Sequence, residues 1–562
     1  MTEYLELKVT DCKHCYKCIR SCPVKAIRFS DNQAAIMQDE CILCGRCFVS
    51  CPQNAKRVHD DLPKAQALMS GKRPVIASVA PSFAANYPGV AIEGVKEALI
   101  RLGFTDAEET AVGATLVKRR YDEMVFKGKQ SIIISTCCHT VNMLVEKYYP
   151  DVLPHLAAVI SPMQAHARMI HQRHSDAAVV FIGPCVSKKA EAARYPGDVD
   201  CVLTYDELNI WLMEKEISLP AKQVRQKQGN DGEGRARLFP TAGGILRTMR
   251  RENTDYSYIS VDGMDDCIAA LKDIAAGNLN NCFVEMSACN GSCIGGPTMN
   301  RAAGLVRSAA QINAYAPRAD FTVTECFPDN MEKRMHFSSP PRPRFGEKAI
   351  TDVLQKIGKK KPEDELNCGS CGYDTCREKA QAVLSGKANL EMCLPYLMGK
   401  ARSFSDTIIH NTPNGILVLN ESLEIQQINR AACHILNVKQ GDDVLGRSVV
   451  CLMEPSLFFE VMEKDVPVYD HRQYLAEYDR YVDLTIIRDT AYGLIIGIMR
   501  DATEIESDRM ARRHIADKTI RITDEVVDKQ MRTVQEIASL LGETVAETKI
   551  ALTNLKETLR ND

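Results

Sequence analysis

The sequence predicts a protein of several domains, some α+β and some α/β, and three observations support this fold class. The chain has 562 residues, whereas a single hydrophobic core seldom grows beyond about 250–300 residues. Sixteen of its 23 cysteines fall into cluster-like patterns, which is typical of metal-binding units. Between residues 73 and 345, apolar runs typical of buried strands alternate with helical patterns, as in an α/β domain with parallel strands.

The charge and hydropathy of the chain exclude some classes of binding partner. The formal net charge is −3, and this balance gives no electrostatic footprint for nucleic acid. Residues 1–6 are acidic and lack the basic and apolar regions of a signal peptide. Apolar runs such as residues 494–499 are far shorter than the roughly 20 residues that span a bilayer. We therefore expect a cytoplasmic protein that binds neither nucleic acid nor membrane.

Residues 1–62 contain one cysteine pattern twice. Cysteines at positions 12, 15, 18 and 22 precede a proline, and cysteines at 41, 44, 47 and 51 repeat that spacing before a second proline. The pattern resembles the bacterial two-cluster ferredoxin, in which the fourth cysteine of each run ligates the other [4Fe-4S] cluster. The matched second copy disfavours zinc. The expected ligands are Cys12, Cys15, Cys18 and Cys51 for one cluster, and Cys41, Cys44, Cys47 and Cys22 for the other.

Residues 73–345 form the predicted two-lobed α/β domain. Buried strands are expected at 75–79, 132–135 and 179–183, and helices at 92–102 and 144–149. In such domains ligands gather at the carboxyl ends of the strands and in the crevice between lobes. Any chemistry of this domain is therefore expected at the strand ends.

Three cysteine segments lie in this domain, and two of them directly follow predicted strands. They are Thr136-Cys137-Cys138, Pro184-Cys185-Val186-Ser187-Lys188, and residues 288–296 with Cys289 and Cys293. Together they resemble the three active-site segments of the [FeFe]-hydrogenase H-domain. That family binds the H-cluster, a [4Fe-4S] cubane joined to a diiron subcluster with CO and CN ligands, and reacts with hydrogen.

The resemblance implies a role for each residue. A compact cation with three donors, such as Lys188, suits an anionic diatomic ligand, and the family lysine pairs with a cyanide. The cysteine at the position of Cys137 passes protons to the open iron, so Cys137 and Lys188 are the expected catalytic residues. The implied cubane ligands are Cys138, Cys185, Cys289 and Cys293, the last of which also bridges to the diiron unit.

The sequence also departs from the family pattern. Gly183 and Ser287 occupy positions where family methionines pack against the diiron unit, so we expect a roomier, more polar pocket. Ala157 occupies the position of a relay serine, and a basic residue near 118–120 replaces a relay glutamate. An alanine cannot transfer a proton. The resemblance therefore implies a hydrogenase of low activity, whereas a cubane-only assembly factor of the same fold is the alternative.

Residues 346–403 contain a third cysteine pattern. Its four members, with spacings of two, four and sixteen residues between them, are Cys368, Cys371, Cys376 and Cys393. The pattern resembles small domains that hold one [4Fe-4S] cluster in corrinoid and redox proteins. A structural zinc ion is the alternative, and the electron-handling domains that precede it favour the cluster.

Residues 404–505 are predicted to form a small α+β domain. Strands are expected at 415–420 and 423–429, a short helix at 431–436, and a closing hairpin at 481–489 and 493–501. Thr412-Pro413-Asn414-Gly415 and Asp501-Ala502-Thr503-Glu504 are among the fragments that resemble a PAS domain. Such a domain without a cofactor motif is expected to serve docking and relay.

Residues 506–562 show a heptad repeat typical of a coiled coil, and an ordinary helix packed on its own domain is the alternative. The coiled coil predicts a homodimer. One apolar position holds Val527, Val534, Leu541, Thr548 and Leu555, and the other holds Met531, Ala538, Val545, Leu552 and Leu559.

These features lead to one functional hypothesis and two alternatives. The hypothesis is a hydrogen- or redox-sensing [FeFe]-hydrogenase-like protein, an H2:acceptor oxidoreductase with an H-cluster and three further [4Fe-4S] clusters. Its expected partners are H2, protons, an electron carrier that the sequence does not name, and a downstream kinase or phosphatase. The alternatives are an ordinary catalytic hydrogenase and an iron–sulfur assembly or scaffold protein without the diiron site.

Overall fold

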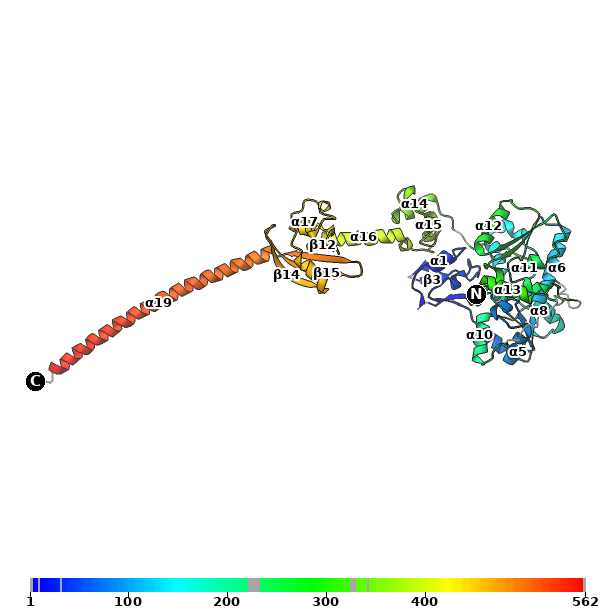
Figure 1. The fold of residues 1–562 in the computed structure, drawn as a ribbon, viewed down its shortest axis with the longest axis horizontal. Helices are drawn as coiled ribbons and strands as arrows, with labels where there is room; N and C mark the ends of the chain where they lie inside the picture. The colour runs from blue at the N-terminus through cyan, green and yellow to red at the C-terminus, as the bar shows by residue number, and fades with distance from the viewer. Residues whose placement is uncertain are drawn as a thin grey trace. The chain divides into compact units, whose positions relative to one another are not determined.

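The computed structural model describes residues 4–8, 11–30, 33–220, 233–323, 330–340 and 343–558 (Figure 1). Leu559, the last apolar position of the expected coiled coil, lies outside the described residues. The chain divides into two compact units, residues 1–397 and residues 398–562. The elements within these units confirm the predicted multidomain class of α+β and α/β parts.

The N-terminal part consists of two similar halves, each with a cysteine run and a short helix. Strand β1 pairs with β4 and β2 pairs with β3, both antiparallel. The helix of each half follows a residue with positive φ, Tyr16 (56°) and Gly45 (72°), which turns the cysteine loop tightly. The elements are β1 (Leu5–Leu7), α1 (Lys17–Ser21), β2 (Ile27–Ser30), β3 (Gln33–Ile36), α2 (Arg46–Val49), β4 (Lys56–Val58) and α3 (Leu62–Met69).

Two parallel sheets form the central domain, in agreement with the expected two lobes. The strand orders are β6-β5-β8-β9 and β10-β11-β7, and every pairing is parallel. All residues of β5, β8 and β11 are buried, which explains their apolar sequence. The strands are β5 (Val75–Val79), β6 (Asp106–Glu109), β7 (Ile132–Ile134), β8 (Ala178–Gly183), β9 (Cys201–Thr204), β10 (Ser257–Asp262) and β11 (Cys282–Ser287).

Helices connect these strands. The helix predicted at 92–102 is α5 (Ile92–Leu102), but the helix predicted at 144–149 begins earlier, since α7 spans His139–Tyr148. The first turn of α7 is buried on every side, so no polar face marks it in the sequence. The others are α4 (Phe83–Asn86), α6 (Ala111–Lys127), α8 (Pro162–Arg173), α9 (Ser187–Arg194), α10 (Tyr205–Glu214), α11 (Gly244–Thr248), α12 (Met264–Ala275) and α13 (Leu305–Tyr315).

A small helical domain follows and lies against the N-terminal part. It contains α14 (Glu347–Lys356) and α15 (Cys376–Leu384). Lys387 Nζ lies 2.6 Å from a carboxylate oxygen of Glu40, and the Phe29 N–H donates to the Lys387 carbonyl (2.8 Å). Arg20 donates to the carbonyls of both Ser370 (3.1 Å) and Cys15 (3.0 Å). The contacts of Lys387 with Glu40 and of Arg20 with Ser370 join residues more than 300 positions apart in sequence.

The second unit begins within α16 (Leu394–Asn411) and contains an antiparallel sheet of order β13-β12-β16-β15-β14. The predicted strands and short helix are present, whereas β14 and α18 were not predicted. Phe458 is fully buried beside Gly497, where a Cβ would lie 3.2 Å from its ring. The elements are β12 (Gly415–Asn420), β13 (Ile425–Ile428), α17 (Arg430–Ile435), α18 (Ser456–Lys464), β14 (Val468–Leu475), β15 (Arg480–Asp489) and β16 (Leu494–Asp501).

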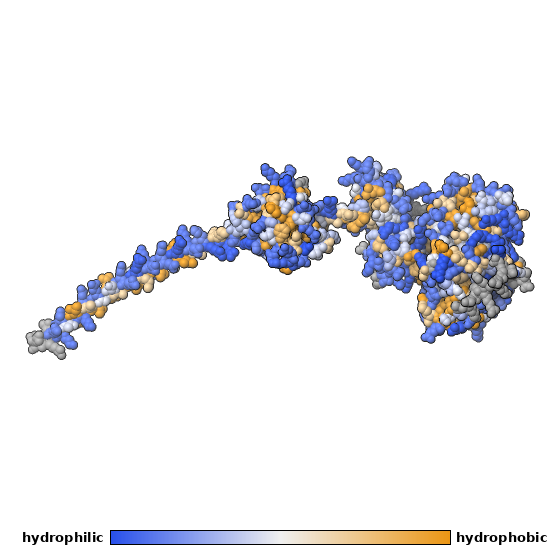
Figure 2. Space-filling model, viewed as in Figure 1, coloured by the Kyte–Doolittle hydropathy of each residue, from blue (hydrophilic) through white to orange (hydrophobic). Residues whose placement is uncertain are grey.

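One long helix, α19 (Thr503–Thr558), ends the described chain. Every described side chain from residue 507 onward is exposed, so this part of the helix does not pack on its own domain. Its apolar residues lie open to solvent as patches along the helix (Figure 2), and Val534 and Leu541 are 60% and 59% exposed. Among the helices that the structure describes, none is both long and apolar enough to cross a membrane.

Candidate functional site

The three cysteine segments of the central domain converge on one cavity. Each segment follows the carboxyl end of a strand: β7 leads to Cys138, β8 to Cys185 and β11 to Cys289. Because β8 belongs to one sheet and β7 and β11 to the other, the cavity lies between the two lobes. The cysteines of these three segments that line it are Cys137, Cys138, Cys185, Cys289 and Cys293.

The donor set of this cavity fits an iron–sulfur cluster. Burial, and after it the charges of neighbouring cysteines, raise the pKa of Cys138, Cys289 and Cys293, and the pKa of Cys293 reaches about 12. Metal binding requires thiolates and releases their protons. Soft thiolates gathered in a dry cavity are the ligands that iron–sulfur clusters use, so positively charged iron would offset the repulsion among them.

Cys137 is held by a tyrosine that the sequence analysis missed. Its Sγ lies 3.3 Å from the hydroxyl of Tyr121, in α6. That hydroxyl also accepts a hydrogen bond from the Thr136 N–H (2.9 Å), and the Thr136 hydroxyl donates to the Val159 carbonyl (2.8 Å). Burial raises the pKa of the Cys137 thiol to about 12, which keeps it a proton-carrying thiol at neutral pH.

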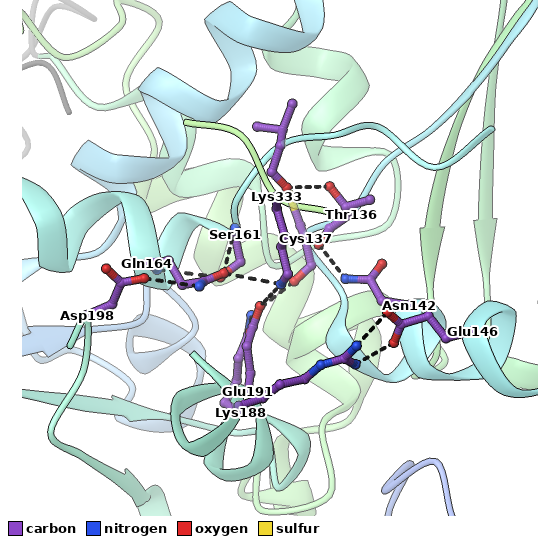
Figure 3. A network of polar contacts seen from close by, with 12 residues as sticks. Thr136, Cys137, Asn142, Glu146, Ser161, Gln164, Lys188, Glu191, Asp198 and Lys333 are labelled. Carbon is purple, nitrogen blue, oxygen red and sulfur yellow. Dashed lines mark hydrogen bonds and ion pairs between the residues drawn. The ribbon is translucent and has the colours of Figure 1, made fainter. Parts of the chain in front are cut away.

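Lys188 belongs to a buried charge network that also includes Glu191 and Lys333 (Figure 3). Its ammonium donates to the Cys137 carbonyl (3.1 Å) and pairs with Glu191. The other oxygen of Glu191 lies 2.6 Å from Lys333 Nζ, which also donates to Gln164 (3.2 Å). Burial alone would raise the pKa of Glu191, but Lys188 and Lys333 hold it well below its usual range. The carboxylate in turn raises the pKa of Lys188.

The structure shows which groups surround the positions at which the sequence departs from the hydrogenase pattern. A Cβ on Gly183 would lie 2.8 Å from the ring of Phe181, so that ring takes part of the room expected beside the glycine. Ser287 lines the cavity, and its buried hydroxyl has no hydrogen-bond partner among the described residues. Ala157 is fully buried and packs with Tyr121 in an apolar core.

Glu285 is a second residue that the sequence analysis missed. It lies in β11, two positions before Ser287 and on the same face of the strand. Its side chain lines the cavity and is almost fully buried, and burial raises its pKa to about 7, although the Leu246 N–H donates to it (2.9 Å). The sequence signal that could have identified Glu285 is a carboxylate in an otherwise mostly apolar strand.

The cysteines of the N-terminal part form two groups with different neighbours. Cys44 lines the same cavity as the central cysteines and raises the pKa of Cys289. Backbone N–H groups point at the sulfurs, with Ala26 donating to Cys22 (3.2 Å) and Ala55 to Cys51 (3.3 Å). Cys12, Cys15, Cys18 and Cys51 line a separate pocket.

The third cysteine set also meets in one place. Cys368, Cys371, Cys376 and Cys393 line a single pocket together with Lys379. Burial lowers the pKa of Lys379 to about 8. Within the described ranges, no group of three His, Cys, Asp or Glu side chains is placed to hold a single metal ion.

Comparison with protein families assigns the central part of the chain. Residues 73–297 match the family of the iron only hydrogenase large subunit, C-terminal domain. The central domain is therefore hydrogenase-like. Around it, residues 5–65 match a 4Fe-4S dicluster domain, residues 364–395 an Fe-S cluster family, and residues 403–471 the PAS fold.

Individual relatives share modest identity with this chain. Iron hydrogenase 1 of Clostridium pasteurianum is 24% identical over 292 residues, covering 41% of this chain and 50% of that protein. A cytosolic Fe-S cluster assembly factor of Eremothecium gossypii is 32% identical over 108 residues, covering 19% and 23%. The chain thus spans half or less of the length of these curated relatives. A variant of the [FeFe]-hydrogenase HydA1 from Chlamydomonas reinhardtii covers 50% of this chain and all of that one, at 18% identity and a TM-score of 0.40.

The hydrogenase domain therefore brings together every cysteine that the sequence singled out in it. Cys137 and Lys188 lie in the same cavity wall as the four expected cluster ligands. Of the two pocket positions, Ser287 lines the cavity, while Gly183 lies behind Phe181. Tyr121, Glu191, Lys333 and Glu285 join the site from elements that the motifs do not include.

Proposed function

We propose that this protein senses hydrogen or cellular redox state through slow, reversible hydrogen oxidation at an H-cluster in its hydrogenase domain. The observation that carries the proposal is the meeting of four cysteines with Lys188 and Cys137 in one buried cavity. Cys138, Cys185, Cys289 and Cys293 would hold the cluster. When bound, this group supplies the hydrogen chemistry, and the protein supplies binding, orientation and electrostatics.

The residues around the cavity have distinct tasks in this proposal. Lys188 presents a permanent positive charge, because Glu191 keeps it protonated, and so orients an anionic ligand. Cys137 holds a proton that Tyr121 positions. The Tyr121 hydroxyl contacts the Thr136 hydroxyl (3.3 Å), which donates to the Val159 carbonyl. The side chain of Ala157 can neither donate nor accept a proton. Proton delivery along this side is therefore slow in this proposal.

Electrons would leave the cavity through the N-terminal part. Cys44 lines the cavity, so the cluster of Cys41, Cys44, Cys47 and Cys22 is the nearest acceptor. The small helical domain lies against this part, and Arg20 joins the Cys15 loop to the Ser370 loop. Three [4Fe-4S] clusters besides the H-cluster would thus form one electron-carrying body within residues 1–397.

We further propose five functional parts, with boundaries at 1–62, 73–345, 346–403, 404–505 and 506–562. In this scheme the PAS domain and α19 report the redox state to a separate kinase or phosphatase. Asn429 supports a relay, because its side chain donates both to the Ile409 carbonyl of α16 and to the Asn414 carbonyl (2.8 Å each). A change at the end of α16 would reach the PAS sheet through this residue.

Infrared spectroscopy of protein matured with the diiron unit tests the proposal. We expect stretching bands of iron-bound CO and CN, and we expect their loss in Cys293→Ala. If no such bands form, the result favours the second candidate function, an assembly or scaffold role. The 32% identity to an assembly factor over 108 residues supports this second candidate. Hydrogen turnover as fast as that of a production hydrogenase, measured by gas chromatography, would instead indicate an ordinary enzyme.

A first prediction concerns the number of clusters. Four sets of four cysteines should hold about sixteen irons before maturation, counted as four per cubane. Cys393→Ala should lose about four of them, because Cys393 is buried in the third pocket. Cys433→Ala, which changes a cysteine of the PAS domain, is the control and should lose none. An unchanged iron content in Cys393→Ala would contradict the third cluster.

A second prediction concerns assembly and relay. The exposed apolar face of α19 should pair with a second copy, because pairing buries it. Light scattering should give a dimer at micromolar concentration, and Leu541→Glu, which places a charge in the seam, should give a monomer. A monomeric wild-type protein would contradict the coiled coil.

Hydrogen exchange across residues 404–558 should differ between the hydrogen-reduced and the oxidised protein, and identical exchange would leave the PAS domain a scaffold.

A further inference from the structure

Lys56, the first residue of β4, is a buried lysine with no ion-pair partner in the described structure. Only 4% of the residue is exposed, and its Nζ has no hydrogen-bond partner among the described residues. Burying an ammonium without a partner is costly. The position therefore requires a negative group that the side chains around it do not provide.

The surroundings of Lys56 indicate which group this is. Lys56 lines the pocket that also contains Cys12, Cys15, Cys18 and Cys51. The same pocket contains the four cysteines that are expected to hold the first cluster, and a bound cluster there would be the missing negative group.

The internal repeat of this part supplies a reference position. Residues 22–27 and 51–56 repeat Cys-Pro-x-x-Ala, and the sixth residue is Ile27 in the first copy and Lys56 in the second. Both copies turn alike, since Lys25 and Asn54 have φ of 51° and 50°, and in both the alanine N–H donates to the cysteine Sγ. Ile27 is buried, with 1% exposed. One backbone thus places an apolar side chain in one half and a cation in the other.

We propose that Lys56 is a built-in countercharge for the [4Fe-4S] cluster of Cys12, Cys15, Cys18 and Cys51, and that it makes this cluster the preferred electron store of the N-terminal part. Reduction adds one electron to the cluster, supplied by a one-electron donor, and makes the cluster more negative by one charge. A fixed cation in a low-dielectric pocket stabilises the more negative state. The cluster of Cys41, Cys44, Cys47 and Cys22 has Ile27 at the equivalent position. A different cation, Lys147, lies near this cluster, but its ammonium already donates to the carbonyls of Cys41 (2.8 Å) and Gln38 (3.4 Å), whereas Lys56 has no such partner among the described residues.

The electron store has a consequence for signalling. An electron that enters from the hydrogenase cavity would come to rest at the cluster beside Lys56, instead of returning to the cavity. Arg20 holds the Cys15 loop of that cluster against the Ser370 loop of the small helical domain. The reduced state would therefore persist next to the third cluster. This electron route rests on the proposed function, whereas the countercharge role of Lys56 concerns the ferredoxin-like part alone and is tested without the hydrogen chemistry.

A redox titration followed by electron paramagnetic resonance tests the inference. The full chain, reconstituted with iron and sulfide but without the diiron unit, is titrated with dithionite in wild-type, Lys56→Met and Lys56→Arg forms. At the potential that half-reduces the wild-type cluster, the reduced-to-oxidised ratio in Lys56→Met should fall at least tenfold, which is about 59 mV for a one-electron couple. Lys56→Arg, which keeps the charge, should stay within about twofold. Equal potentials in wild type and Lys56→Met, or equal shifts in both variants, would overturn the proposal.

A reverse variant covers the case in which Lys56→Met fails to bind its cluster. Ile27→Lys places the cation at the equivalent position of the other half, and it should raise the reduced fraction of the second cluster at a fixed potential. Ile27→Met is its matched control and should leave both potentials unchanged. If the lysine at position 27 leaves that cluster's potential unchanged while iron content is preserved, a buried cation at this position does not tune the cluster, and the proposal fails.

Discussion

Glu191→Ala should destabilise the hydrogenase domain by about 3–5 kcal/mol, the usual cost of leaving buried charges without their partner. Glu191 is fully buried and neutralises two ammonium groups, those of Lys188 and Lys333. Its removal leaves both cations in a protein interior, with only neutral acceptors at the Cys137 carbonyl and Gln164. No other single substitution in the described network removes the partner of two buried charges.

The chain offers a local probe for this measurement. It contains one tryptophan, Trp211 of α10, which is buried in the hydrogenase domain and packs against Phe104 with ring centroids 5.8 Å apart. Urea unfolding followed by tryptophan fluorescence therefore reports on this domain alone. The matched control is Glu123→Ala, which removes an exposed partner of Arg120 in the same domain and should cost less than about 1 kcal/mol. Equal midpoints for the two variants would contradict the network.

The same network predicts a pH dependence. The pKa of Glu191 is lowered on folding, so its contribution to stability is fully present above the unfolded pKa of about 4.3. That contribution is lost as pH falls through the lower folded pKa. The gap in unfolding free energy between wild type and Glu191→Ala should therefore be constant near neutral pH and should narrow below about pH 4. A gap that widens on acidification would reverse the assignment.

Cys137→Ala should lower hydrogen turnover by about 10²- to 10⁴-fold, the usual range for a positioned proton donor. In the proposed function the Cys137 thiol, which lies 3.3 Å from the Tyr121 hydroxyl and next to the expected ligand Cys138, carries the proton. Turnover is measured with a chemical reductant, and infrared bands and iron content verify that the cofactors are still bound. Cys282→Ala, which changes a buried cysteine of β11 outside the cavity lining, is the control.

Unchanged turnover in Cys137→Ala would show that protons enter by another residue. Glu285 is then the candidate, because it lines the cavity and burial raises its pKa to about 7, between the acid and base forms at neutral pH. Glu285→Gln keeps the shape and the hydrogen bond from the Leu246 N–H but cannot carry a proton. A large loss in Glu285→Gln together with none in Cys137→Ala would move the proton route to this side of the cavity.

Much of the fold and the grouping of the cysteines could be predicted because the patterns that indicate them are local in sequence. The bounds of α5 and β12 follow from the apolar period and from flanking turns, and cysteine spacing predicts which cysteines gather at one pocket, as the third set does. Lys333 could not be found in this way, since it meets Glu191 across 142 positions. Tyr121 lies on a helix whose sequence reads as ordinary core. The predicted start of α7 was wrong because complete burial of its first turns removes the amphipathic pattern that indicates a helix.

The contacts of the small helical domain with the N-terminal part have a consequence for how such proteins are cut and recombined. The salt bridge between Lys387 and Glu40 and the hydrogen bond from the Phe29 N–H to the Lys387 carbonyl join residues 346–397 to the N-terminal part. Both belong to the same compact unit. Truncation before residue 346 would expose a polar docking face, whereas a cut after residue 397 follows the boundary of the compact unit. The exchangeable module is therefore the PAS domain with α19, and any graft of this module onto another protein should leave the third cysteine set behind.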